Sequence, residues 1–212
     1  TLREVADLAP DIILSQESPG KQSVAALAGE LFGEVGASLA GPDAAILVRG
    51  RIMEHGVPAG APGNAVWARV KLASGPEVLV VSLRLEPCPI RFDLWSADCW
   101  SSQRANRQLR RRQLAAILEA LPEARGIPVI VGGDFNAPAG DPVFRAFPRG
   151  FRDAFREAGR GWGDTIVNQV PMQRIDQIWI DRGLLAANAG ALRTINSDHR
   201  LVWADLWLPT SP

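Results

Sequence analysis

Residues 130–138 read IVGGDFNAP, a short apolar run that ends in two glycines and is followed by polar side chains. The run predicts a buried strand, and open sheets present their ligand-binding groups beyond the carboxyl ends of such strands. Asp134 and Asn136 are two residues apart, so in an extended segment they project from the same face. A carboxylate that orients water beside an amide that donates to phosphate suits ester hydrolysis. The alternative is a plain turn, because GGD and NAP both favour turns.

A second polar cluster, NSDHR at residues 196–200, precedes the last predicted strand. His199 is one of only two histidines in the chain. If the strand begins irregularly there, Asp198 can take a metal ion while the imidazole of His199 faces a substrate. The alternative is an Asx turn with an exposed histidine.

Two further carboxylates need partners. Residues 174–180 read RIDQIWI, and their alternation places Arg174 and Asp176 on the face shared with two isoleucines. An unpaired carboxylate in apolar surroundings is unfavourable, so Asp176 requires either Arg174 or an imidazole as its partner. Glu17 ends the apolar run at 12–17 and poses the same question. Its carboxylate suits a hard cation such as Mg²⁺.

The pattern of apolar residues predicts a single mixed α/β domain over residues 1–212. Helices are expected at 2–8, 21–31, 100–121 and 141–147, and strands at 12–17, 44–49, 65–73, 78–85, 127–131, 174–180 and 200–208. The segments 55–64 and 86–98 contain several glycines or prolines and are expected to be loops. No internal repeat or domain linker interrupts this pattern.

The composition limits how a ligand is recognised. In the 212 residues, Lys plus Arg and Asp plus Glu are both 23, so the formal net charge is zero. No global field draws a polyanion to this surface, and any recognition of phosphate must be local. Cys88 and Cys99 fit no metal-ligand spacing, and they can form a disulfide or stay free thiols.

The chain contains no apolar run of the ~20 residues that a membrane span needs, and its start lacks a signal-peptide pattern. It begins without Met, inside a predicted helix. We therefore expect a soluble segment whose longer parent can carry an anchor or a signal upstream, which leaves the location open.

Taken in chain order, the polar motifs resemble those of a known family. The motifs are QE at 16–17, GGDFN at 132–136, RID at 174–176 and SDH at 197–199. Their order and spacing resemble the endonuclease/exonuclease/phosphatase superfamily, the deoxyribonuclease I-like folds, over nearly the whole chain. The resemblance implies a four-layered α/β sandwich with mixed central sheets. It also implies a site where the two central sheets open at one edge.

The same resemblance implies roles for individual residues. Glu17 would ligate a divalent metal, Mg²⁺ or Mn²⁺, and Asp198 would join it or lie close by. Asp134 would orient and activate the attacking water, and Asn136 would hydrogen-bond the phosphate. The metal would offset phosphate charge while the side chains position an in-line displacement.

His199, held by Asp176, would stabilise the developing charge. The chain is therefore expected to be a divalent-metal-dependent phosphoric ester hydrolase, a phosphodiesterase or endonuclease-like enzyme, that binds its phosphate ester as a monomer. Nucleic acid is the first expected substrate, because the motifs resemble the nucleases most broadly. The alternatives are a phosphatase or phosphodiesterase of phospholipid or inositol-type headgroups, and a non-catalytic binding relative.

Two features depart from the family pattern. Family members carry an Asn or Asp on a first strand upstream of the opening helix, and that strand is missing here, which would leave backbone groups unpaired and the metal one ligand short. In the segment 80–85, VVSLRL, Arg84 stands where the family commonly has a histidine. Arginine binds phosphate oxygens through its planar fork, so Arg84 is expected to bind substrate. Pairing with Glu86 or another carboxylate near the strand end is the alternative.

Two surface features leave the substrate open. The predicted helix at 100–121 carries five arginines opposite its apolar stripe, namely Arg104, Arg107, Arg110, Arg111 and Arg112. Such a row can neutralise the phosphates of a nucleic acid, although a solvated helix face is the more common explanation. Trp95, Trp100 and Trp162 lie in or beside loops and can stack on a base or a lipid headgroup, or simply pack.

Overall fold

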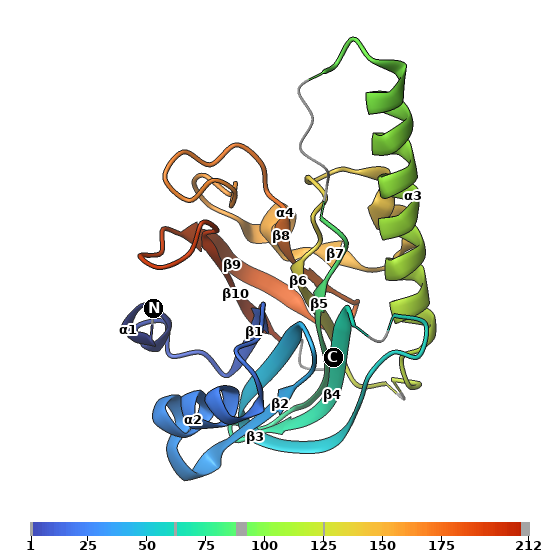
Figure 1. Ribbon diagram of the computed structural model, residues 1–212. Coiled ribbons are helices and arrows are strands. Elements are labelled where there is room, and N and C mark those ends of the chain that lie inside the picture. The colour runs from blue at the N-terminus through green and yellow to red at the C-terminus, as the bar shows by residue number, and fades with distance from the viewer. Residues whose placement is uncertain (1, 62, 88–92, 125, 209–212) are drawn as a thin grey trace.

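The computed structural model describes residues 2–61, 63–87, 93–124 and 126–208 (Figure 1). Its helices are α1 (Leu2–Ala6), α2 (Lys21–Phe32), α3 (Ala97–Glu119) and α4 (Ala154–Ala158), with the 3-10 helices η1 (Gly33–Val35) and η2 (Pro142–Ala146). Its strands are β1 (Ile12–Gln16), β2 (Gly36–Ala40), β3 (Ala44–Gly56), β4 (Ala65–Leu72), β5 (Glu77–Arg84), β6 (Val129–Asp134), β7 (Arg152–Asp153), β8 (Asp176–Ile180), β9 (Leu185–Leu192) and β10 (Leu201–Trp207). None of the described helices is both long and apolar enough to span a membrane.

Eight strands form one mixed sheet in the order β1-β3-β4-β5-β6-β8-β7, with β2 also paired to β3. β5 and β6 run parallel and are connected through α3, while the other neighbours are antiparallel. The long β3 joins two parts of the sheet, because its first half pairs with β1 and β2 and its second half pairs with β4. The sheet therefore folds over on itself at β3.

Successive side chains of β5 point alternately into two different core clusters, which shows how the layers form. Leu79, Val81 and Leu83 join α3 in one core cluster, whereas Val78 and Val80 face the first half of β3 in a second cluster. α2 covers the other face of β3 in a third cluster. Figure 1 shows α2 and α3 on opposite sides of the strands. The layers are thus helix, sheet, sheet and helix, as expected for a four-layered α/β sandwich with mixed central sheets.

β9 and β10 form a separate antiparallel pair. Leu206 of β10 packs in one cluster with Ile12 of β1 and with Ile130 and Ile180 of the main sheet, so this pair extends the layer that contains β1. In the described part of the chain, no strand precedes α1. Among the named strands, β1 pairs only with β3 and β10 pairs only with β9.

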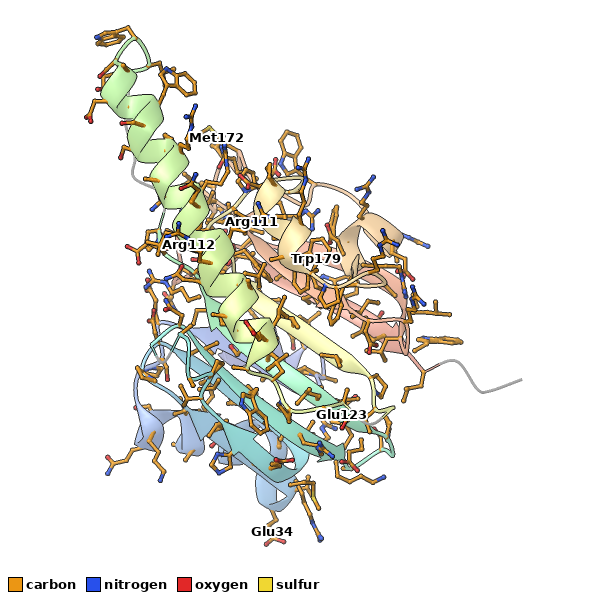
Figure 2. The ribbon with its side chains drawn as sticks, turned by 90° about the vertical axis from the view of Figure 1, so that its right-hand side faces the viewer. Glu34, Arg111, Arg112, Glu123, Met172 and Trp179 are labelled. Atoms are coloured by element: carbon orange, nitrogen blue, oxygen red, sulfur yellow. The ribbon has the colours of Figure 1, made fainter. Side chains whose placement is uncertain are left out.

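The helix α3 divides the row of arginines. Arg110 is buried, and Arg107 is bound to Asp141, with 3.1 Å between Nε and Oδ2. Four arginines of the row are exposed, namely Arg104, Arg107, Arg111 and Arg112, and of these Arg107 is held by Asp141. Figure 2 labels Arg111 and Arg112. Cys99 near the start of α3 is a buried free thiol, and Cys88 lies outside the described residues.

Several elements differ from the sequence-based expectation. β2, β7, α4 and β9 were not predicted, and β9 (LAANAGAL) has few of the branched residues that favour strands. The helix expected near 141–147 is the 3-10 helix η2, which Asp141 caps by accepting the N–H of Val143. β3 continues to Gly56, into the expected loop. Of the other expected loop, at 86–98, residues 88–92 lie outside the described part of the chain.

Candidate active site

The register of three neighbouring strands brings predicted polar residues together. β5 pairs with β6 so that Arg84 lies opposite Asp134, and β6 pairs with β8 so that Asp134 lies opposite Asp176. Both carboxylates are buried, Asp134 at 5% exposed and Asp176 at 7%. One edge of the sheet therefore holds a guanidinium and two buried acids that are far apart in the sequence.

The turn after β6 depends on Gly133 and Asn136. Gly133 has φ 140°, and a Cβ there would lie 2.0 Å from the carbonyl oxygen of Leu83, so a side chain would break the pairing with β5. Asn136 adopts the left-handed conformation with φ 48°, which asparagine tolerates. Its N–H donates to Asp134 Oδ1 (2.8 Å), and its amide donates to Asp134 Oδ2 (3.0 Å) and to the carbonyl oxygen of Leu85 (2.8 Å). The stretch is both a turn and a polar site.

His199 reaches the site from the segment between β9 and β10. Its Nδ1 lies 2.9 Å from Oδ2 of Asp176. The segment is held by the fully buried Asn168, whose amide donates to the carbonyl oxygen of Ser197 (2.8 Å) and whose N–H donates to that of Asp198 (2.7 Å). No sequence pattern marks Asn168, a single amide in a loop. It acts on the site by fixing the backbone that leads into His199.

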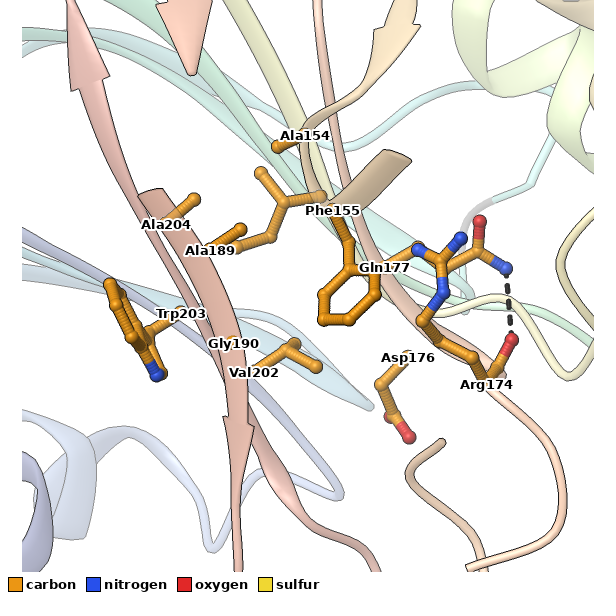
Figure 3. A pocket seen from close by; sticks show the side chains of 11 residues that line it. Ala154, Phe155, Arg174, Asp176, Gln177, Ala189, Gly190, Val202, Trp203 and Ala204 are labelled. Carbon is orange, nitrogen blue, oxygen red and sulfur yellow. Dashed lines mark hydrogen bonds between the residues drawn. The ribbon is translucent and has the colours of Figure 1, made fainter. Parts of the chain in front are cut away.

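Arg174 is not the partner of Asp176, because it is already bound elsewhere. Its guanidinium forms a bidentate pair with the buried Asp153 and lies over the ring of Phe155, 4.9 Å from the centroid. Figure 3 shows Arg174, Phe155 and Asp176 around a small pocket beside β10. Of the two partners considered for Asp176, the structure thus gives it the imidazole of His199.

Arg84 gathers three carboxylates at the edge of the site. Its Nη2 lies 2.7 Å from Glu17 Oε1, its Nη1 3.0 Å from Asp43 Oδ2, and its Nε 3.9 Å from Asp134 Oδ2. Burial lowers the pKa of Arg84, but the hydrogen bond to Asp43 and the three carboxylate charges outweigh it and raise that pKa, so the guanidinium stays charged. Of the carboxylate partners considered from the sequence, the described residues thus give Arg84 other carboxylates at the end of β5 and not Glu86.

Glu17 reaches Arg84 from the end of β1. Its backbone is left-handed, with φ 53°, and its N–H donates to the carbonyl oxygen of Asp43 over 2.9 Å. The preceding Gln16 donates from Nε2 to Ser82 Oγ on β5 over 3.1 Å, which ties the end of β1 to the strand that carries Arg84. The side chain of Glu17 is 73% exposed, so it lies at the rim of the site.

Burial and a like charge perturb Asp134. Burial raises its pKa, and the charge of Asp176 raises it further, to about 6, against the lowering effects of the Asn136 N–H and of the His199 and Arg84 charges. A carboxylate whose pKa lies just below neutral suits a general base. Burial is the larger cause of the rise and the charge of Asp176 the smaller, and the charges of His199 and Arg84 do not cancel them.

The pKa of His199 is raised to about 9. The hydrogen bond to Asp176 is the largest cause, burial opposes it, and the charges of Asp176, Asp134 and Asp198 add to the rise. The imidazole is therefore protonated at neutral pH. Nδ1–H then donates to Asp176, and Nε2–H is left to donate to a further group.

The carboxylates at this edge of the sheet suit a hard divalent cation, whereas a protonated His199 cannot ligate one. Within the part of the chain that the structure describes, Asp134, Asp176 and His199 are the group whose ligand atoms all lie within 4.8 Å of one another. Glu17 and Asp198 lie outside that group: Arg84 binds Glu17, and Asp198 is exposed beside His199. Carboxylate oxygens suit Mg²⁺ or Mn²⁺, and a cation beside the buried Asp134 and Asp176 would favour their charged forms.

Replacing His199 with Gln is expected to destabilise the fold in a pH-dependent way. The pKa of about 9 in the fold lies above the value of about 6.5 in an unfolded chain, so the stabilisation is fully present below about pH 6.5 and is lost as pH rises through about 9. The difference between the two proteins should shrink by about 1–2 kcal/mol across that range, allowing for solvent screening. Urea unfolding in chelator near both limits measures it, and a difference independent of pH would contradict the ion pair.

Known proteins share the sequence pattern and the fold of this chain. The sequence profile described as Endonuclease/Exonuclease/phosphatase family matches residues 1–199. Among curated proteins, no sequence matches the chain.

Similar solved structures include an endonuclease/exonuclease/phosphatase from Bacteroides vulgatus (17% identity, TM-score 0.73, covering 98% of this chain and 88% of that one). A mannosyl-6-phosphatase from Bacteroides thetaiotaomicron has 17% identity and a TM-score of 0.73, covering 98% of this chain and 89% of that one. The human Nocturnin catalytic domain has 18% identity and a TM-score of 0.69, covering 98% and 84%. At these identities the structures show a shared fold, and the family profile spans most of the sequence. The chain therefore belongs to the endonuclease/exonuclease/phosphatase family.

Proposed function

We propose that the chain is a divalent-metal-dependent phosphoric ester hydrolase with Asp134 as the general base and His199 as the group that stabilises charge on the phosphate. Family members are hydrolases that act on phosphoesters. The observation that carries the proposal is the pairing of His199 with Asp176 at 2.9 Å beside a second buried carboxylate, Asp134. One group with a pKa of about 6 and another of about 9 are, at neutral pH, a base and an acid.

The residues divide the chemistry between them. Asp134 accepts a proton from the attacking water, and Asn136 holds the carboxylate through its N–H and amide. The side-chain amide of Asn136 already donates both of its hydrogens, to Leu85 and to Asp134. Its expected hydrogen bond to phosphate therefore requires one of these two bonds to break. His199 donates from Nε2 to a phosphate oxygen, and Asp176 keeps the imidazole charged and oriented.

The metal and Arg84 act on the phosphate charge. Glu17 and Asp198 would hold Mg²⁺ or Mn²⁺, which when bound polarises the phosphate and offsets its charge. Arg84 binds a phosphate oxygen through Nη2, the atom that donates to Glu17 in this structure. The substrate phosphate thus replaces the Glu17 carboxylate as the acceptor. This exchange keeps the positive charge of the site while Glu17 is released.

Hydrolysis under defined metal conditions tests the proposal. The protein is assayed with a soluble chromogenic phosphodiester, plasmid DNA and a lipid diester, each with Mg²⁺ or Mn²⁺ and with chelator. We expect turnover that chelator abolishes and added Mg²⁺ restores. Equal turnover in chelator would refute the metal-dependent reaction. Metal binding without turnover of any ester would favour the non-catalytic alternative.

The exposed surface near the site supports lipid as a second source of the ester. Of the five arginines on α3, Arg110 is buried and Arg107 is exposed but bound to Asp141, which leaves three exposed arginines outside that ion pair. Large apolar side chains are exposed on segments near the site. We therefore propose hydrolysis of a phospholipid or inositol-phosphate ester as the second candidate function.

A further inference from the structure

Three segments near the site expose large apolar side chains. They are the start of α3 with the residues before it, the loop between α4 and β8, and the segment between β9 and β10. Trp95, Met172 and Ile195, one from each segment, are 87%, 72% and 81% exposed. The others are Leu94, Trp100, Trp162, Val167 and Val170.

Two of these segments border His199 directly. Ile166 forms β-bridges with both His199 and Gln173, so the loop residues between them start and end at the site. That loop carries Val170 and Met172 at its exposed part. Ile195 is four residues before His199, in a segment that Asn168 ties to the same loop.

The third segment lies beyond the end of β5. Asn106 of α3 donates to the carbonyl oxygen of Pro87 over 3.0 Å, just past Arg84. Trp100 is six residues nearer the helix start, about 9 Å further along the axis. Figures 1 and 2 show α3 continuing past the strand ends, and Figure 2 places Met172 at that end of the molecule and Glu34 and Glu123 at the other. The apolar side chains thus share one end with the site.

Each segment also carries an exposed arginine close to its apolar residues. Arg104, Arg160 and Arg193 are four, two and two residues from Trp100, Trp162 and Ile195 respectively. Exposed acids on these segments include Asp98 and Asp198, and Asp198 lies beside His199 in the site. Cations interleaved with apolar side chains complement a surface that is apolar inside and anionic at its boundary.

We propose that this end of the molecule rests on an anionic lipid surface, from which the site takes its phosphoester. The members of the set without an aromatic ring, such as Val170, Met172 and Ile195, neither stack on bases nor donate hydrogen bonds from their side chains, and they gain only by leaving water. The indole N–H groups of Trp100 and Trp162 are satisfied internally, by the Leu94 carbonyl (2.8 Å) and by Asp164 (3.1 Å). Their ring faces are left to a lipid interface, where tryptophan is enriched.

The choice of substrate source rests on the proposed function, whereas the binding itself does not. Cosedimentation with equimolar phosphatidylcholine and phosphatidylglycerol vesicles measures binding in chelator, where no hydrolysis occurs. We expect binding that weakens when phosphatidylglycerol is omitted. Trp95→Ser with Trp100→Ser, and separately Val170→Ser with Met172→Ser, should each weaken it about tenfold or more.

Trp207→Ser is the matched control. Trp207 is 67% exposed but pairs with Leu185, at the end of the β9–β10 sheet away from His199, and its loss should leave vesicle affinity unchanged. Thermal unfolding verifies that each variant is folded. The proposal is overturned if the wild-type protein does not bind the vesicles. It is also overturned if Trp207→Ser weakens vesicle binding as much as the double variants do. Single-stranded oligonucleotide binding lost in the same variants, without vesicle binding, assigns the surface to nucleic acid and also overturns it. Hydrolysis of the soluble diester is scored separately and tests only the proposed function.

Discussion

Asp134→Asn is expected to lower kcat for hydrolysis of a soluble phosphodiester by about 10²–10⁴-fold, the range that a positioned general base contributes. Asparagine keeps the size of the side chain and one oxygen that can accept the Asn136 N–H, but it takes no proton from water. Initial rates at saturating Mg²⁺ measure the change. Asp205→Asn, at an exposed carboxylate on β10, is the matched control and should keep the wild-type kcat.

The same substitution should leave the protein folded and change how its stability depends on pH. The pKa of Asp134 is about 6 in the fold and about 4 in an unfolded chain, so its negative charge destabilises the folded wild-type protein. This destabilisation is absent below about pH 4, grows as pH rises, and is complete above about pH 6. Relative to wild type, the variant should gain stability between these limits. An amide donor now facing the Asn136 amide offsets part of that gain. Normal turnover, or turnover lost only through unfolding, would contradict Asp134 as the base.

Most of the central sheet follows from patterns that are visible in the sequence. β5 and β6 are runs of Val, Leu and Ile, and branched apolar residues favour strands wherever both faces are buried. β9 escaped prediction because its Ala, Gly and Asn residues carry no strand preference. It is extended because β10 supplies its hydrogen bonds, which is a tertiary cause.

The candidate site divides in the same way. The motifs mark Asp134, Asp176 and His199, and the structure brings these three together. Their connections depend on strand register and loop closure, which short motifs do not encode. Asp43 meets Arg84 from a loop whose backbone accepts the N–H of Glu17, a contact between segments that no motif marks. A single polar residue such as Asn168 becomes recognisable only once its burial is known.

Asp153→Ala is expected to destabilise the fold by about 3–5 kcal/mol, the effect of leaving one member of a buried ion pair without its partner. Asp153 and Arg174 are 7% and 8% exposed, and their bidentate pair joins the start of α4 to the segment that leads into β8. Asp153 also caps α4 by accepting the N–H groups of Phe155 and Arg156, worth about another 1 kcal/mol. Urea unfolding measures the loss.

Two companion variants separate the ion pair from simple loss of contacts. Glu157→Ala removes a less buried ion pair, between Glu157 of α4 and Arg152 of β7, and should cost only about 1 kcal/mol. Asp153→Leu combined with Arg174→Met removes both charges, so the unpaired guanidinium disappears and part of the stability should return. Arg174 lies two residues before Asp176, the partner of His199. Asp153→Ala should therefore also position Asp176 less firmly, and turnover should fall in protein that is still folded. A loss no larger than that of Glu157→Ala would show that the buried pair does not fix this edge of the site.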